Sequence, residues 1–236
     1  SMSSIKLKHS GGNSVSLNPP SSAPTASDVA FKLPNADGSA NQVIKTDGSG
    51  NLSFTTVADT NDNTWVKLSK TTITSNTSQV DFTNSITGAF DTYKTYVVTV
   101  TGLVPQNDDY TLRARKFDSN GIYSGSEQQT RVVENGTGYS YAGESSFVLI
   151  RQGIGNNSSG SEVYENFNGI FYFFNFAANN RFSVMSSCVY KNASSDAIFT
   201  TMGGTTNVTT ATTGIRFYMS SGDISTGEFT LYGIAT

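Results

Sequence analysis

A single repeating pattern runs through the sequence from Trp65 to Ile234. Runs rich in Val, Ile, Thr, Tyr and Phe alternate with breaks at Gly or Asn. The first group of residues suits a pleated, half-buried surface, whereas Gly and Asn favour turns. The pattern therefore predicts an all-β domain. Its runs span residues 64–69, 96–103, 110–117, 145–151, 168–174, 182–190, 214–219 and 227–234.

The number and spacing of these runs bear on the architecture. About ten strands, joined by segments of uneven length and closed by an aromatic run, favour a two-sheet jelly-roll β-sandwich over an up-and-down barrel. In residues 110–117, Leu112 and Ala114 alternate with polar residues, which predicts one inward and one solvated face. We expect a sandwich whose strands each present one side to a shared core.

One run is apolar on both faces. It comprises Ile170, Phe171, Tyr172, Phe173 and Phe174. A strand of this kind is expected where one side packs on the second sheet and the other side is also covered. We predict that this strand forms the contact between the subunits of a trimer.

The first quarter of the chain has a different character. Val43, Ile44, Leu52 and Phe54 flank the turn residues 47–50, which predicts a β-hairpin. An isolated hairpin is marginal in water, so we expect it to need partners such as identical copies from neighbouring chains. Four of the five prolines also lie here and interrupt strand pairing, and the polar cluster at 58–63 reads as a linker. We predict an extended arm over residues 1–60 and a head domain over residues 61–236.

Three stretches of the arm, residues 4–17, 27–34 and 42–54, together resemble the N-terminal module of tail-fibre proteins of tailed bacteriophages, with those of marine phages most similar. The resemblance implies a virion structural protein, located in the tail fibre and made in the host cytoplasm. It also implies a homotrimer, other tail proteins as partners, and attachment to a glycan or outer-membrane receptor on the host. No catalytic or ligand-binding residue carries over from it.

Composition excludes several classes of protein. Only 14% of residues are charged and the net charge is −3, so the basic face of a nucleic-acid-binding protein is not expected. No apolar run reaches the length of a membrane span, and the start lacks the apolar core of a signal peptide. The single cysteine, Cys188, excludes an intrachain disulfide, and we interpret it as a small buried thiol.

Candidate catalytic and metal-binding groups are sparse. The only histidine, His9, lies in the arm, away from the serines and carboxylates of the head, so neither a Ser-His-Asp site nor a histidine-ligated zinc is expected. Residues 59–63 resemble a calcium loop but lack its glycine and its bidentate acid, and Gly203-Gly204 reads as a turn. We predict no enzyme activity, no cofactor and no metal.

Recognition of a polar ligand remains. Two polar segments rich in Gly, Ser and Asn, residues 136–143 and 153–160, read as long loops, and the first carries two tyrosines. Tyr provides amphipathic contact area, and Ser and Asn provide adaptable hydrogen bonds. The receptor-binding residues predicted from this pattern are Tyr139, Tyr141, Asn156 and Asn157.

Two alternatives stay open. One is a capsid decoration protein or other virion-surface protein without a receptor role. The other is a glycan depolymerase, since glycoside hydrolysis needs only two suitably spaced acids. The acids available for such a pair are Asp108, Asp109, Glu144, Glu162 and Glu165.

Overall fold

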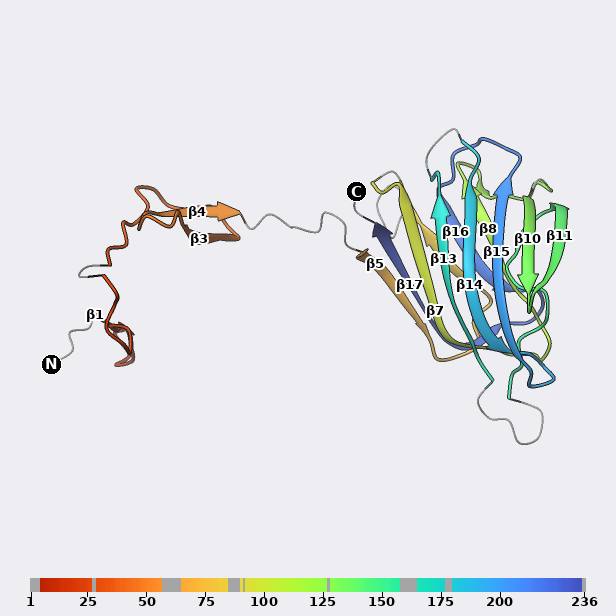
Figure 1. Ribbon diagram of the computed structural model, residues 1–236, viewed down its shortest axis with the longest axis horizontal. Helices are drawn as coiled ribbons and strands as arrows, with labels where there is room; N and C mark the ends of the chain where they lie inside the picture. Colours follow the sequence, from red (N-terminus) through yellow and green to blue (C-terminus); the bar gives the residue numbers. More distant parts are fainter. Residues whose placement is uncertain are drawn as a thin grey trace. The chain divides into compact units, whose positions relative to one another are not determined.

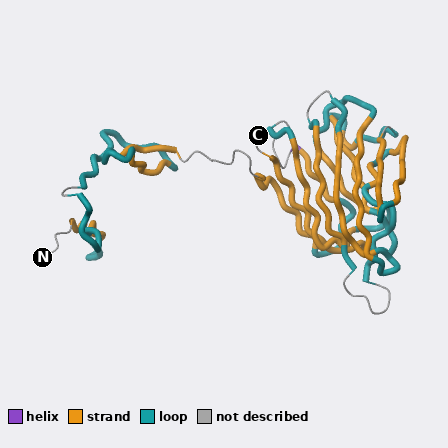
Figure 2. The backbone as a smooth tube through the Cα atoms, viewed as in Figure 1, coloured by secondary structure: helices purple, strands orange, loops and turns teal. Residues whose placement is uncertain are grey.

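The computed structural model describes residues 5–26, 29–56, 65–84, 90, 92–126, 128–157, 165–176 and 180–234. The chain divides into two compact units, Ser1–Thr60 and Asn61–Thr236, a division that coincides with the one predicted between arm and head. Strands dominate the head, whereas most of the arm is loop, as the colouring in Figure 2 makes clear. Every pair of named strands is antiparallel. The predicted all-β class is confirmed. The polar cluster at 58–63 lies outside the described residues.

The arm contains two separate hairpins (Figure 1). The second hairpin is the one predicted from the sequence, and its turn has Gly48 and Gly50 at φ values of 82° and 88°, where a side chain would be strained. Asp47 closes this turn: its Oδ1 accepts hydrogen bonds from the backbone N–H groups of Ser49, at 2.7 Å, and Asn51, at 3.1 Å. The strands are β1 (Ile5–Lys8) with β2 (Ser14–Leu17), and β3 (Gln42–Thr46) with β4 (Leu52–Thr56).

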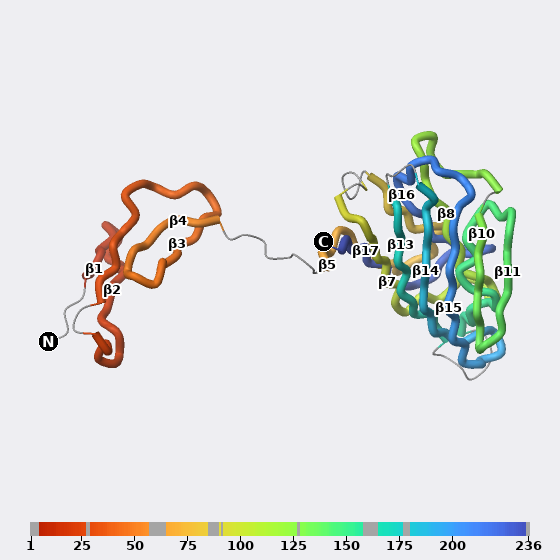
Figure 3. Tube along the Cα trace, turned by 45° about the horizontal axis from the view of Figure 1, so that its top comes forward, coloured from red at the N-terminus to blue at the C-terminus, as the bar shows by residue number. Residues whose placement is uncertain are grey.

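The head is a sandwich of two antiparallel sheets (Figure 3). The larger sheet has eight strands in the order β11-β10-β15-β14-β13-β7-β17-β5. In chain order these are β5 (Trp65–Ile73), β7 (Thr95–Pro105), β10 (Gln128–Glu134), β11 (Thr137–Glu144), β13 (Phe167–Phe174), β14 (Ser183–Lys191), β15 (Ala197–Thr206) and β17 (Ile224–Ile234). The smaller sheet has the order β12-β8-β16-β6, with β9 paired to β8. Its strands are β6 (Val80–Thr83), β8 (Leu112–Asp118), β9 (Gly121–Ile122), β12 (Phe147–Val148) and β16 (Gly214–Met219).

Aromatic side chains from both sheets form the core between them. Phe217 of β16 lies 5.4 Å from Phe171 and 6.0 Å from Phe173 of β13, measured between ring centroids. Phe229 of β17 also contacts the Phe217 ring, at 5.5 Å between centroids. All four side chains are fully buried. Aromatic pairs at these separations add to the stabilisation from buried apolar area, so this cluster holds the two sheets together.

The predicted trimer contact is wrong for two of its five residues, Phe171 and Phe173 of the central strand β13. Phe171 and Phe173 point inward and are completely buried within one chain, so these two side chains have no surface to offer another subunit. Side chains alternate along a strand, and Ile170, Tyr172 and Phe174 therefore lie on the outer face of the larger sheet, where they are half-buried. Only these three keep the outward position that a subunit contact requires.

Candidate functional site

The two tyrosines predicted to bind a receptor lie in a strand and not in a loop. Tyr139 and Tyr141 belong to β11, the edge strand of the larger sheet, opposite Val132 and Thr130 of β10. Because both partners face inward, the tyrosines do too, and they are half-buried. The guanidinium carbon of Arg151 lies 4.1 Å from the Tyr139 ring centroid. The expectation of exposed loop tyrosines is therefore corrected: both rings close the edge of the sandwich.

The two asparagines have structural roles. The Asn156 N–H donates to Asp108 Oδ1 at 3.2 Å, and its side-chain amide donates to the carbonyl of Gln106 at 3.1 Å. Asn157 and Glu165 form a reciprocal pair: the Asn157 N–H donates to Glu165 Oε2 at 2.8 Å, and the Glu165 N–H donates to Asn157 Oδ1 at 2.6 Å. These bonds fasten the loop that follows β12.

The pairing of Glu165 with Asn157 also decides whether Glu165 could act in glycoside hydrolysis. Glu165 is 1% exposed, and its Oε1 also accepts a hydrogen bond from Ser195 Oγ at 2.8 Å. Gly155 packs so closely against this carboxyl group that a Cβ there would lie 2.4 Å from it. Glu165 is thus sealed away from any polymer, and Glu162 lies outside the described residues.

A second buried carboxylate, Glu134, organises the interior near the end of β10. It is 3% exposed and accepts hydrogen bonds from the backbone N–H groups of Arg151, at 3.3 Å, and Gln152, at 3.2 Å. The Gln152 side chain and the Tyr190 hydroxyl also donate to it, at 2.8 and 3.0 Å. Burial opposes ionisation, but these donors outweigh it and hold the pKa of Glu134 below its ordinary value. This cluster fixes the segment after β12 and has no opening to a ligand.

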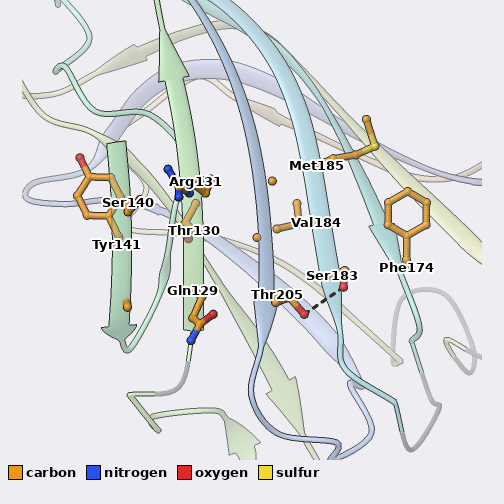
Figure 4. A pocket seen from close by; sticks show the side chains of 13 residues that line it. Gln129, Thr130, Arg131, Ser140, Tyr141, Phe174, Ser183, Val184, Met185 and Thr205 are labelled. Atoms are coloured by element: carbon orange, nitrogen blue, oxygen red, sulfur yellow. Dashed lines mark hydrogen bonds between the residues drawn. The ribbon is translucent and has the colours of Figure 1, made fainter. Parts of the chain in front are cut away.

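A candidate binding site instead lies on the outer face of the larger sheet. A groove of about 560 Å³ crosses β11, β10, β15, β14 and β13, and Figure 4 shows the side chains around it. Its volume is within the range of about 300–1,000 Å³ that is usual for ligand sites. The side chains that face outward into it are Gln129, Arg131, Ser140, Phe174, Ser183, Met185 and Thr205.

The groove exists because β15 has a glycine at its centre. Gly203 pairs with Arg131 of β10 on one side and with Met185 of β14 on the other. No atom outside its chain neighbours lies within 4 Å of where its Cβ would be, so the space above it is open. Arg131, Gly203 and Met185 thus form a row across three strands. A second hollow of about 230 Å³ lies on the other side of this row and shares these three residues with the first hollow. The two hollows form one channel along β15, which we call the outer groove.

This finding corrects the interpretation of Gly203-Gly204 as a turn. Both residues lie within β15, between Met202 and Thr205. The buried positions of this strand include Thr200 and Thr206, and the outward positions include Phe199. Residue type therefore does not follow the two faces, and the sequence holds no apolar–polar alternation that would place the glycines in a strand.

The charge of the outer groove is unbalanced. Among the residues that the structure describes, Arg131 is the only charged one that lines either hollow, and no aspartate or glutamate of that set lines them. In the part of the head that the structure describes, its guanidinium makes no hydrogen bond or ion pair, whereas Arg216 is held by Asp81 through two bonds of 2.7 Å. The groove therefore presents one uncompensated positive charge.

Two further aromatic residues, Trp65 and Tyr232, lie on the same outer face as Tyr172 and were not singled out as site residues from the sequence. Trp65 of β5 contacts Tyr232 of β17 at 5.5 Å and Tyr172 of β13 at 6.2 Å between ring centroids. Val97 lies between the two tyrosines in the strand register and is fully buried, so the cluster covers it. Trp65 itself is 42% exposed. The outer face thus carries an accessible aromatic surface on β13, β17 and β5, whereas Arg131 lies on β10, toward the opposite edge of the sheet.

The chain matches no family model, no curated protein and no solved structure. Within the described ranges, no helix combines the length and hydropathy needed to cross a bilayer. Among the same residues, no group of three or more His, Cys, Asp or Glu side chains is arranged to hold a metal ion.

Proposed function

We propose that this chain is a tail-fibre-like structural protein of a tailed bacteriophage that attaches the virion to its host. The arm forms a homotrimer and joins other tail proteins, and the jelly-roll head binds a glycan or an outer-membrane receptor. The observation that carries the proposal is the open outer groove on a head whose buried carboxylates, Glu134 and Glu165, are committed to structural hydrogen bonds. Such a head suits binding rather than turnover.

The arm supports the homotrimer. Ile5 pairs with Leu17 and Leu7 with Val15, so all four side chains share one face of the first hairpin. Each is between 64% and 71% exposed within a single chain. Full burial of one such side chain is worth about 1.5–3 kcal/mol, and a two-stranded hairpin is marginal alone. Three copies would cover these faces and their open strand edges.

The connections between the strands of the head favour the jelly-roll architecture. The chain passes back and forth between the sheets, from β5 to β6, to β7, to β8, and later from β15 to β16 to β17. Repeated crossing between two antiparallel sheets is typical of this architecture. Trimerisation would place three outer grooves on one particle, so that weak single-site binding becomes useful avidity.

The proposal is tested on phage particles and on cells. Antibody raised against the head should label the tail in electron micrographs, and the purified chain should adsorb to host cells and compete with phage adsorption. Label over the capsid shell would instead support the decoration protein. Tail label without any competition would contradict the receptor-binding role of the head.

A further inference from the structure

We propose that the outer groove binds an acidic saccharide, with the carboxylate of a uronic-acid-like residue on Arg131. This inference rests on the proposed attachment function and specifies the class of receptor. It names a polymer of sugar acids at the cell surface in place of a neutral glycan or a protein receptor.

The outer groove carries an uncompensated positive charge. Within the described part of the head, the guanidinium of Arg131 has no partner and no acid lines the groove to compensate it. Arginine presents a planar fork of donors that matches a carboxylate with two parallel hydrogen bonds. An anionic group of the ligand therefore completes an interaction that the chain leaves open.

The walls of the outer groove combine apolar and polar side chains. Phe174 and Met185 provide an apolar surface on the β13 and β14 side of the groove. Ser183 and Thr205 lie beside them and share a hydrogen bond of 3.2 Å, and Gln129 provides an amide on the β10 side (Figure 4). A pyranose ring has apolar C–H groups on its faces and hydroxyls on its rim, so it can pack on the first surface while it hydrogen-bonds to the second.

The outer groove is elongated and suits a linear polymer. The outer groove follows β15 from Thr201 to Thr205, a floor about 13 Å long at the usual rise per residue of a strand. Its walls on β10 and β14 are two strand spacings apart, about 10 Å. Because Arg131, Gly203 and Met185 form the row shared by both hollows, a linear chain would lie along β15 with its acidic residue at the middle.

Charge also separates this ligand from a nucleic acid, which is the other common linear polyanion. Binding to nucleic acid depends on many phosphate contacts from Lys and Arg. The groove has one cation and the whole chain carries a net charge of −3. A single anchoring cation among hydroxyls, an amide and apolar side chains suits a sugar acid instead.

The test uses the full-length chain and two trisaccharides of the same size. The probes are trigalacturonic acid and its neutral methyl ester, and isothermal titration calorimetry measures their dissociation constants. The parent chain should bind the acid at least tenfold more tightly than the ester, since a hydrogen-bonded charge is lost in the ester. Rising salt should weaken binding of the acid and leave the ester unchanged.

Two variants and two matched controls locate the site. Arg131→Gln should remove the preference for the acid, and Arg131→Lys should keep only part of it because Lys is a point charge without the fork. Gly203→Val fills the floor and should abolish binding of both probes. Lys67→Gln removes an exposed cation at the far edge of the same sheet, and Gly138→Val adds the same side chain to β11, where a Cβ also meets no atom within 4 Å. Both controls should bind as the parent does.

Other results would overturn the inference. The inference fails if the parent chain binds the acid and the ester equally, or does not bind the acid. It also fails if Arg131→Gln keeps the preference for the acid and Gly203→Val still binds the probes. Adsorption to host cells separates this failure from that of the proposed function. If the parent, Arg131→Gln and Gly203→Val adsorb equally, attachment stands and the groove is not its site. If the parent binds trigalacturonic acid but adsorbs to no host cell, the attachment function fails instead.

Discussion

The hydroxyl of Tyr190 donates a hydrogen bond of 3.0 Å to Glu134 Oε2, deep inside the head. The carboxylate is almost completely buried and receives further donors from Arg151 and Gln152. Burial, followed by the neighbouring negative charge, raises the pKa of Tyr190. The tyrosine therefore stays protonated and serves as a permanent donor to an ionised acid.

Replacing this acid should change the pH dependence of stability. The folded-state pKa of Glu134 is lower than the ordinary value of 4.5, so its contribution is complete above that value and is lost as pH falls through the folded-state pKa. Glu134→Gln should lower the free energy of unfolding at pH 7 by about 1–3 kcal/mol, because one carboxylate oxygen that accepts hydrogen bonds becomes a donor. Urea unfolding from pH 7 to pH 3 should show a flatter profile for the variant. Glu144→Gln, on the neighbouring strand, is the control, and an E134Q profile as steep as the parent's would refute the assignment.

The alternation along β13 predicts opposite outcomes for two adjacent residues. Phe173→Ala should cost about 3–5 kcal/mol in the free energy of unfolding, since it leaves a cavity beside Phe217 in the core. Phe174→Ala removes a half-buried ring from the outer face and should cost less than half as much. Chemical denaturation of both variants measures the difference. Similar losses would mean that the inward and outward faces are assigned incorrectly.

The glycine pair of β15 offers a second comparison of neighbours. A Cβ on Gly203 would meet open space, so Gly203→Val should leave the melting temperature unchanged or raise it slightly, because valine favours strands. A Cβ on Gly204 would lie 2.9 Å from the Phe147 ring and 3.1 Å from the Gln129 carbonyl oxygen. Gly204→Val should therefore lower the free energy of unfolding by about 1–3 kcal/mol through overpacking. Thermal melts of the two variants should differ in this sense, and the reverse order would contradict the open floor of the outer groove.

The arm predicts a change of mass in solution. The parent chain should elute at about three times 25.2 kDa in size exclusion with light scattering. Replacing Ile5 and Leu7 by Ser removes half of the apolar face of the first hairpin and should shift the protein toward the monomer. Replacing Lys6 and Lys8 by Ser, on the opposite face of the same strand, should leave the trimer intact. A monomeric parent would contradict the proposal that the arm forms a homotrimer by itself.

The cysteine should be inert while the head is folded. Cys188 points into the core, and burial raises the pKa of its thiol to about 12, so very little thiolate exists at neutral pH. A maleimide should label it at pH 7 only after denaturant unfolds the head, and mass spectrometry of the labelled chain follows the reaction. Rapid labelling of the native protein would place this strand at the surface.

The sequence predicts the strands well where one face is polar and the other apolar. Leu112 and Ala114 of β8 are buried as their alternation predicts, and the same rule places Lys116 inside. What the rule cannot supply is how a lysine is accommodated there: its ammonium group donates to the carbonyl and hydroxyl oxygens of Thr210, at 3.0 and 2.7 Å, and lies 4.6 Å from the Tyr123 ring centroid. Thr210 is distant in sequence and Tyr123 is reached across the turn from β8 to β9, so only the fold reveals these partners.

The candidate site is harder to predict for the same reason. Tyr139 and Tyr141 look like loop residues because glycines surround them, yet pairing with β10 makes the segment a strand. The outer groove depends on the register that aligns Arg131, Gly203 and Met185 across three strands. A shift of one residue in β10 or in β14 would send Arg131 or Met185, respectively, to the other face of the sheet. No local pattern in a single sequence specifies that alignment.

Because β5 pairs with β17, this part of the larger sheet cannot form in the order in which its strands are synthesised. Among the described strands of the head, β5 comes first in the chain, lies at an edge of the larger sheet and pairs only with β17, which comes last. The two hairpins of the arm are local and can form early, whereas pairing between such distant segments is slow. A ribosome must therefore release residues 224–234 before β5 has any neighbour in the sheet. A head truncated within those residues would leave β5 and β7 with unpaired edges, and its predicted fate in the cell is aggregation.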